Sequence, residues 1–262
     1  MGSLAGKSPA NTYKSLLKVA DETNGVSGTA SQIEDGEGTS TCISVGDDNF
    51  KVKPQSDNTT TTFEVENASG SNLLTVDSSN SVVKVGTSQV SATTQLLTFA
   101  SYRIVPNSSG SHMFIALGGT NFGANQHPES NAGTGTDPST SIAFGTSKDE
   151  MVLSFFSAPY NMTIDAVKVL SSTDTDTDTI LNFHLMSYDF VNDGTTNDGN
   201  ISNGTVLADG QATAVDRSVI KTTDLTVQSS SVTSGKVIAC CVENETNTDD
   251  INIQVQVKYH IA

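Results

Sequence analysis

Three aspartates at alternate positions, Asp174, Asp176 and Asp178, form the segment of this chain that most resembles a metal-binding loop. Alternate carboxylates begin the calcium loop of an EF-hand, which places glycine at position six and a bidentate glutamate at position twelve. Thr179 and Leu185 occupy those positions here, so the EF-hand assignment fails. In an extended segment the three side chains point to one side and repel one another. We expect a solvated hairpin tip here, with a bound cation as the alternative.

Motifs for catalysis are missing from the sequence, which contains no Gly-x-Ser-x-Gly, P-loop, Gly-x-Gly-x-x-Gly or His-Glu-x-x-His pattern. The four histidines are scattered, and no two are spaced like ligands of one metal. His184 and His260 fall within alternating strand patterns, where we expect polar side chains that face outward. Acidic residues are so abundant that none stands out as a pair for glycoside cleavage. We expect no catalytic residues, no metal site and no cofactor.

A long segment rich in Gly, Asn and Ser, residues 118–147, is a candidate for recognition. A stretch of this length without secondary structure inside a compact domain is usually functional or mobile. Its amide and imidazole groups could donate hydrogen bonds to a host receptor, and a phenyl ring could stack on it. The candidate receptor contacts are Asn121, Phe122, Asn125, Gln126 and His127. A connecting loop without any role in recognition is the alternative.

The net charge of −16 argues against two classes of partner. Nucleic acids and anionic membranes bind clustered lysine and arginine, and the sequence has no basic run. The three cysteines, Cys42 and the adjacent Cys240 and Cys241, are too irregular for a disulfide framework or a zinc site. The N-terminus lacks the apolar core of a signal peptide, and no apolar stretch approaches the ~18 residues that cross a bilayer, so we expect folding in a cytosol.

The strand patterns predict an all-β protein whose residues 96–262 form an antiparallel β-sandwich, jelly-roll-like, with polar turns between about eight strands. The clearest half-buried strand ends the chain. Its alternating face consists of Ile251, Ile253, Val255, Val257, Tyr259 and Ile261. Because hydrophobic residues make up only 35% of the chain and aromatic residues 6%, we expect the missing burial to come from association.

Residues 42–95 contain short strands at intervals of roughly ten residues, a spacing typical of consecutive β elements. Such strands are too short to enclose a core of their own. We expect their apolar side chains to form a trimer interface. These residues are Phe63, Val65, Leu74, Val76, Val83 and Val85.

Residues 1–41 are predicted to be an attachment arm and linker. Ser8 and Pro9 could begin a short helix with Tyr13, Leu16 and Leu17 on one face, and an extended arm is the alternative. These three apolar residues are our candidates for docking on a larger particle. Residues 21–41 are almost without apolar side chains and predict a loop that only a partner would order.

Three segments near the N-terminus resemble virion fibre proteins of tailed phages, particularly those of marine and cyanobacterial hosts. They are TYKSLLKV at Thr12–Val19, DGEGT at Asp35–Thr39 and the dipeptide Asp47–Asp48. The following unit also has the form F-x-V-x-N-x-x-G-x-x-x-L-x-V-D, from Phe63 to Asp77. The resemblance covers about the first 86 residues; beyond them only a generic β pattern is visible.

The resemblance implies a homotrimer that is mounted on the virion by its N-terminal region and carries its C-terminal domain outward. We therefore expect a non-enzymatic virion protein, assembled in the host cytoplasm, that attaches the particle to a host surface glycan. The chain lacks a long stalk of repeats, which leaves a capsid decoration or cement protein as the first alternative. A glycan-degrading tailspike is the second. Mounting on the tail and mounting on the capsid both remain open.

Overall fold

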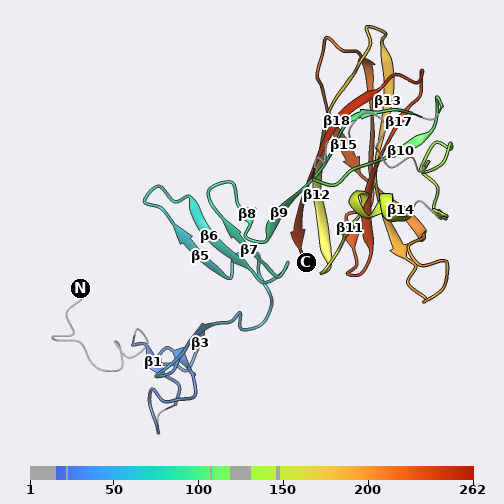
Figure 1. Ribbon diagram of the computed structural model, residues 1–262. Coiled ribbons are helices and arrows are strands. Elements are labelled where there is room, and N and C mark those ends of the chain that lie inside the picture. The colour runs from blue at the N-terminus through green and yellow to red at the C-terminus, as the bar shows by residue number, and fades with distance from the viewer. Residues whose placement is uncertain (1–15, 22, 107, 119–130, 146–147) are drawn as a thin grey trace. The chain divides into compact units, whose positions relative to one another are not determined.

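The computed structural model describes residues 16–262 apart from residues 22 and 107 and the segments 119–130 and 146–147. The chain divides into two compact units, Met1–Ala92 and Thr93–Ala262. In the described residues both units consist of antiparallel strands with little helix, which confirms the prediction of an all-β protein (Figure 1). No helix in the described part of the chain is long and apolar enough to cross a membrane.

The first unit begins with a four-stranded antiparallel sheet in the order β1-β2-β3-β4. Its strands are β1 (Lys18–Val19), β2 (Ser31–Glu34), β3 (Ser40–Val45) and β4 (Phe50–Val52). The expectation of an irregular linker over residues 21–41 is wrong for β2 and for the start of β3. Polar contacts compensate for the scarcity of apolar residues: the Thr41 hydroxyl donates to the Ile33 carbonyl across the β2–β3 pair.

The residues expected to dock on a virion lie before this sheet. Leu16 and Leu17 are exposed, and residues 16–20 are not helical. The prediction of a short helix is therefore wrong for these residues. Tyr13 and the earlier residues of the expected helix lie outside the described residues.

A second four-stranded sheet follows in the order β5-β6-β7-β8. Its strands are β5 (Phe63–Glu66), β6 (Asn72–Asp77), β7 (Val82–Val85) and β8 (Val90–Ser91). The turns are polar and built from local hydrogen bonds, as at Asn67, whose Oδ1 accepts from the backbone N–H groups of Ser69 and Ser71. This arrangement confirms the short strands and polar turns that the sequence predicts here.

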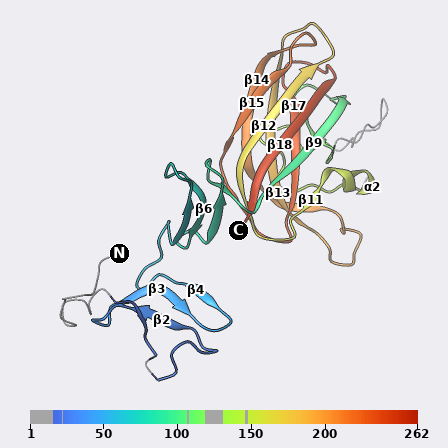
Figure 2. The same cartoon turned by 90° about the vertical axis from the view of Figure 1, so that its left-hand side faces the viewer.

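The second unit is a jelly roll. Its main strands are β9 (Thr94–Ile104), β10 (His112–Ile115), β12 (Met162–Thr173), β13 (Thr179–Phe190), β14 (Ile201–Val215), β15 (Lys221–Val227), β17 (Val237–Asn244) and β18 (Ile251–Ile261). One face of the sandwich has the order β9-β18-β12-β15 and the other β10-β17-β13-β14, so first pairs with eighth, second with seventh, third with sixth and fourth with fifth. Figure 2 shows β12, β18 and β9 side by side.

Two short strands and two short helices complete the unit. They are β11 (Phe156–Ser157), β16 (Ser231–Val232), α2 (Lys148–Met151) and the 3₁₀ helix η2 (Val152–Ser154). β11 pairs with β17 and β16 with β12, while β14 meets β15 at Ala208 and Val227 and so joins the two sheets at one edge. At the other edge the backbone N–H of Ala100 in β9 donates to the Ala116 carbonyl just after β10, which nearly closes the sandwich.

The interior of the sandwich is apolar and comes from both sheets. On β18 the buried residues alternate from Ile251 to Val257, as the sequence predicts, while Tyr259 is half-buried and Ile261 is exposed at the end of the strand. The adjacent cysteines of β17 are both buried, on opposite faces of the strand. Cys240 packs inside the sandwich and Cys241 packs on the outer face of the same sheet.

A second apolar layer covers that outer face. The segment that begins at residue 131 folds over sheet β10-β17-β13-β14, and its Phe144 and Met151 are buried with Met186 and Tyr188 of β13. The Tyr188 hydroxyl donates to the Ser139 carbonyl at 3.2 Å, which ties this cover to the sheet. The long connection is therefore part of the fold over residues 131–145.

The aspartate-rich tip at residues 174–178 differs from its prediction. It connects β12 to β13, which lie in opposite sheets, so it is a crossing loop and not a hairpin. The Asp176 carboxylate accepts from Nε and Nη2 of Arg217 at 2.6 Å each, and Arg103 lies 3.4 Å from Asp174 and 2.8 Å from Asp250. Arginine side chains therefore balance two of the three carboxylates that suggested a cation.

Candidate functional site

Strand register brings polar residues together on the outer face of sheet β10-β17-β13-β14. On β13 the residues Leu181, Phe183 and Leu185 point into the sandwich, so Asn182 and His184 point outward. Residues directly opposite each other on antiparallel strands lie on the same face. Two rows of outward side chains follow from the register: Gln211, Asn182, Glu243 and His112 in one, and Asp209, His184, Cys241 and Phe114 in the next.

A tight loop places Asp137 above these rows. The backbone N–H of His112 donates to the Gly133 carbonyl at 2.9 Å, and that of Ser139 donates to the Ala132 carbonyl, which closes the loop on β10. Gly133 has a φ of +113°, and a Cβ atom there would lie 2.3 Å from Oγ of Ser139. A glycine is therefore required at this position for the loop to bring Asp137 over the sheet.

Loop and sheet together enclose a polar cavity of about 570 Å³. Four carboxylates and several amides and hydroxyls surround it. Its lining residues are Thr134, Gly135, Thr136, Asp137, Asn182, His184, Asp209, Gly210, Gln211, Thr226, Glu243 and Glu245. This composition is suited to a polar or cationic ligand and unsuited to an apolar one.

Amide side chains hold the carboxylates on one side of the cavity. Nδ2 of Asn182 donates to Oε2 of Glu243 at 2.7 Å and to Oε2 of Glu245 at 3.2 Å. Nε2 of Gln211 donates to Oδ1 of Asn182 at 2.8 Å, so the four residues form one hydrogen-bonded row. The row fixes the positions of the Glu243 and Glu245 side chains beside the histidines.

Two histidines lie at the base of the loop: His184 lines the cavity, and His112 packs beside it. His184 is 4% exposed and His112 is fully buried, and their rings meet edge to face with centroids 4.9 Å apart. Nδ1 of His184 and Nε2 of His112 have no hydrogen-bond partner in the described residues. Burial lowers the pKa of both imidazoles, and for His184 the neighbouring His112 lowers the pKa further, so both rings are neutral near pH 7.

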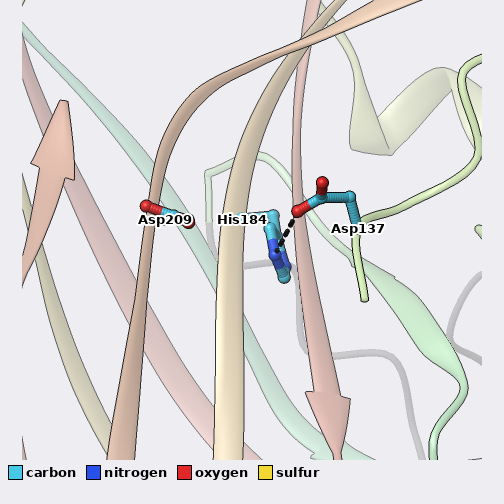
Figure 3. A group of neighbouring side chains, drawn as sticks. All are labelled: Asp137, His184 and Asp209. Carbon is cyan, nitrogen blue, oxygen red and sulfur yellow. Dashed lines mark ion pairs between the residues drawn. The ribbon is translucent and has the colours of Figure 1, made fainter. Parts of the chain in front are cut away.

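His184 lies between two carboxylates from different elements (Figure 3). Asp209 faces it from β14, and Oδ1 of Asp137 lies 3.4 Å from its Nε2. One potential ligand atom from each of the three residues falls within a group whose members are at most 4.8 Å apart. Within the part of the chain that the structure describes, this is the cluster of His, Cys, Asp and Glu side chains that could hold a metal ion.

No protein-family model matches this chain. A search of curated proteins also found no match. The surfaces of the chain itself are therefore what indicates its function.

The cavity was not among the predicted sites, and the predicted receptor contacts cannot be compared with it. Asn121, Phe122, Asn125, Gln126 and His127 all lie outside the described residues. His184 points away from the sandwich interior as predicted, but the loop at Asp137 covers it instead of solvent. The alternation along β13 marked the outward face, whereas nothing in the sequence indicated which loop would lie on it.

The residues expected at a trimer interface do share one surface. Register places Phe63 opposite Val76, and Val65 opposite Leu74. The next strand continues both rows, with Val83 opposite Val76 and Val85 opposite Leu74. The six side chains therefore form one face of strands β5, β6 and β7, which we call the apolar face.

The apolar face is open in the single chain. The exposed fractions are 40% for Phe63, 42% for Val65, 40% for Val83 and 41% for Val85. The opposite face of the same strands is mixed: it carries Glu64, Thr75, Asp77 and Lys84, with a 2.8 Å ion pair between Lys84 and Asp77, and also Leu73 and Val82. Charged side chains on these pairs therefore lie opposite the apolar face.

Proposed function

We propose that this chain is a structural protein of a tailed-phage virion that works as a homotrimer and attaches the particle to a host surface. The apolar face of β5, β6 and β7 is the observation that carries the proposal. The resemblance of the first 86 or so residues to virion fibre proteins supports the viral context, and the jelly roll is an architecture that viral capsid and lectin domains share.

The apolar face favours a partner for energetic reasons. Four of its six side chains are 40–42% exposed, and Leu74 and Val76 are half-buried. Fully burying a valine, leucine or phenylalanine side chain contributes roughly 1.5–3 kcal/mol relative to leaving it exposed. Covering the remaining apolar surface would therefore stabilise a unit this small.

A second and third copy of the same chain are the partners that suit this face. Other copies carry the same net charge of −16, so they repel one another wherever charged surfaces meet. The six residues of the apolar face carry no charge, whereas Glu64, Asp77 and Lys84 lie on the opposite side of the sheet. Three copies can therefore bury these faces around a common axis with their charged faces directed to solvent.

The jelly-roll unit would make the contact with the host. Its polar cavity presents amide, hydroxyl and carboxylate groups of the kind that hydrogen-bond to the hydroxyls of a glycan. Single contacts of this kind are weak, and a trimer present in many copies on one particle converts them into strong attachment through avidity. No chemical step is part of this proposal.

Deleting the protein from the phage that carries it tests the function. We expect particles with intact capsids that adsorb poorly to their host, measured as the fraction of free phage over time. Intact adsorption together with leaking capsids would contradict attachment and favour a cement protein. Shortened oligosaccharides after incubation of the purified protein with host glycan would contradict the absence of enzymatic activity.

A further inference from the structure

We infer that Asp137, His184 and Asp209 form a binding site for a divalent transition-metal ion, with zinc as the best match to the donor set. The site lies entirely in the jelly-roll unit. Its three residues line the cavity to which the proposed function assigns a glycan, and zinc binding can be measured without a glycan or a trimer.

Three separate elements supply the ligands. His184 comes from β13, Asp209 from the neighbouring strand β14, and Asp137 from the loop that Gly133 allows to close over the sheet. Register alone places Asp209 beside His184, because the two residues are direct cross-strand partners. The third ligand therefore completes a site whose other two are fixed by a sheet, which is the more rigid kind of support.

One distance is that of two ligands that share an ion. Nε2 of His184 and Oδ1 of Asp137 are 3.4 Å apart, longer than the roughly 2.7–3.2 Å of a good N–H···O hydrogen bond. Two ligands bound tetrahedrally at about 2.0–2.1 Å from zinc are separated by about 3.3–3.4 Å. The ligand atoms of the whole group lie within 4.8 Å of one another, so rotation of the carboxylates has to close the remaining gap when the ion binds.

The buried imidazole presents one ring nitrogen to the cluster. His184 is 96% buried and lines the cavity, and its Nε2 is the nitrogen that faces Asp137. Nε2 is therefore the atom that would bind the ion, while Nδ1, which has no hydrogen-bond partner in the described residues, is the other ring nitrogen.

The donor set favours a transition metal over calcium or magnesium. Calcium and magnesium take oxygen ligands almost exclusively, whereas imidazole is a preferred ligand of zinc and its neighbours. One nitrogen and two carboxylate oxygens leave at least one coordination position for water from the cavity. Two negative charges from Asp137 and Asp209 also balance the charge of a divalent ion.

Calorimetric titration of the untagged full-length protein with zinc chloride tests the inference. We expect saturable binding of one zinc ion per chain, and no comparable binding of calcium or magnesium. Asp137→Asn and Asp209→Asn should each weaken zinc binding by about tenfold or more, because even substituting a group that only hydrogen-bonds to a metal ligand costs about 10–100-fold. Asp137 is on an exposed loop, so Asp137→Asn is expected to leave the fold unchanged in a melting curve.

The chain offers a matched control. Oδ1 of Asp165 lies 2.9 Å from Nδ1 of His260, a histidine–carboxylate pair outside the cavity. Asp165→Asn should leave zinc affinity unchanged. Zinc should also shift the ring ¹⁵N resonances of His184 and not those of His260. Absence of saturable zinc binding by the wild-type chain, equal weakening by Asp165→Asn, or shifts confined to His260 would each overturn the inference.

Discussion

Asp209 stands directly opposite His184 on neighbouring antiparallel strands, on the outer face of a jelly-roll sheet and beneath the loop that carries Asp137. The pairing is a consequence of register: a slip of one residue between β13 and β14 would turn one of the two side chains into the sandwich interior. The chemistry of the cavity therefore depends directly on the packing of Leu181, Phe183 and Leu185 inside.

Val65→Lys should dissociate the assembly that we propose. The substitution places a charge on the apolar face, where each fully buried apolar side chain contributes roughly 1.5–3 kcal/mol per subunit. Analytical ultracentrifugation at micromolar concentration should show a monomer. Glu64→Lys, one residue earlier on the opposite face of the same strand, is the matched control and should keep the wild-type mass. Equal dissociation by both variants would contradict the assignment of the face.

Two substitutions of Tyr188 should separate what packing and hydrogen bonding in the outer apolar layer each contribute to the free energy of unfolding. Its ring is fully buried and its hydroxyl donates to the Ser139 carbonyl. Tyr188→Phe should lower the free energy of unfolding by about 0.5–1.5 kcal/mol, the net value of one hydrogen bond. Tyr188→Ala should cost about 3–5 kcal/mol, since it also leaves a cavity. Urea unfolding followed by circular dichroism measures both, and equal losses would show that the ring contributes little.

Asp77 should titrate far below an ordinary aspartate. Hydrogen bonds from Asn80 and Lys84 lower the pKa of its carboxyl to about 2. Because the pKa is depressed in the folded state, the stabilisation is complete above the unfolded value of 3.8 and is lost as the pH falls through about 2. Carboxyl ¹³C NMR measures this pKa directly. Asn80→Ala should raise it, whereas Asn67→Ala in a neighbouring turn should not.

The three cysteines should differ in their reaction with a thiol reagent. Cys42 is exposed, while burial raises the pKa of Cys240 and Cys241 and holds both as inert thiols. In the native protein we expect one thiol to react quickly, and all three after denaturation. The Cys42→Ser variant should show no fast reaction. Rapid modification of three native thiols would contradict the packing of β17 on both of its faces.

The sequence predicted most of the jelly roll because its strands alternate strongly, and it failed where structure depends on polar contacts. β18 is recognisable from Ile251 to Val257, and the opposite faces of Cys240 and Cys241 follow from alternation alone. β2 was missed because it has one apolar residue, Ile33, and is held by backbone pairing and the Thr41 hydroxyl.

The candidate metal site shows the same limit. Parity along β13 places His184 on the outer face, but only the pairing with β14 brings Asp209 beside it. Asp137 is 47 residues from His184 in sequence, and its position depends on how the loop at Gly133 closes. Sequence spacing carries no trace of such a contact, whereas the alternate aspartates at 174–178 are visible in the sequence although arginines balance two of them.

The mass of the wild-type chain in solution tests the central claim most directly. Light scattering coupled to size-exclusion chromatography, at micromolar concentration and physiological salt, should give three times the chain mass of 27.3 kDa. That result would place the apolar face of β5, β6 and β7 inside an assembly as the account requires. A monomer under the same conditions, with Phe63 and Val65 left in water, would contradict it.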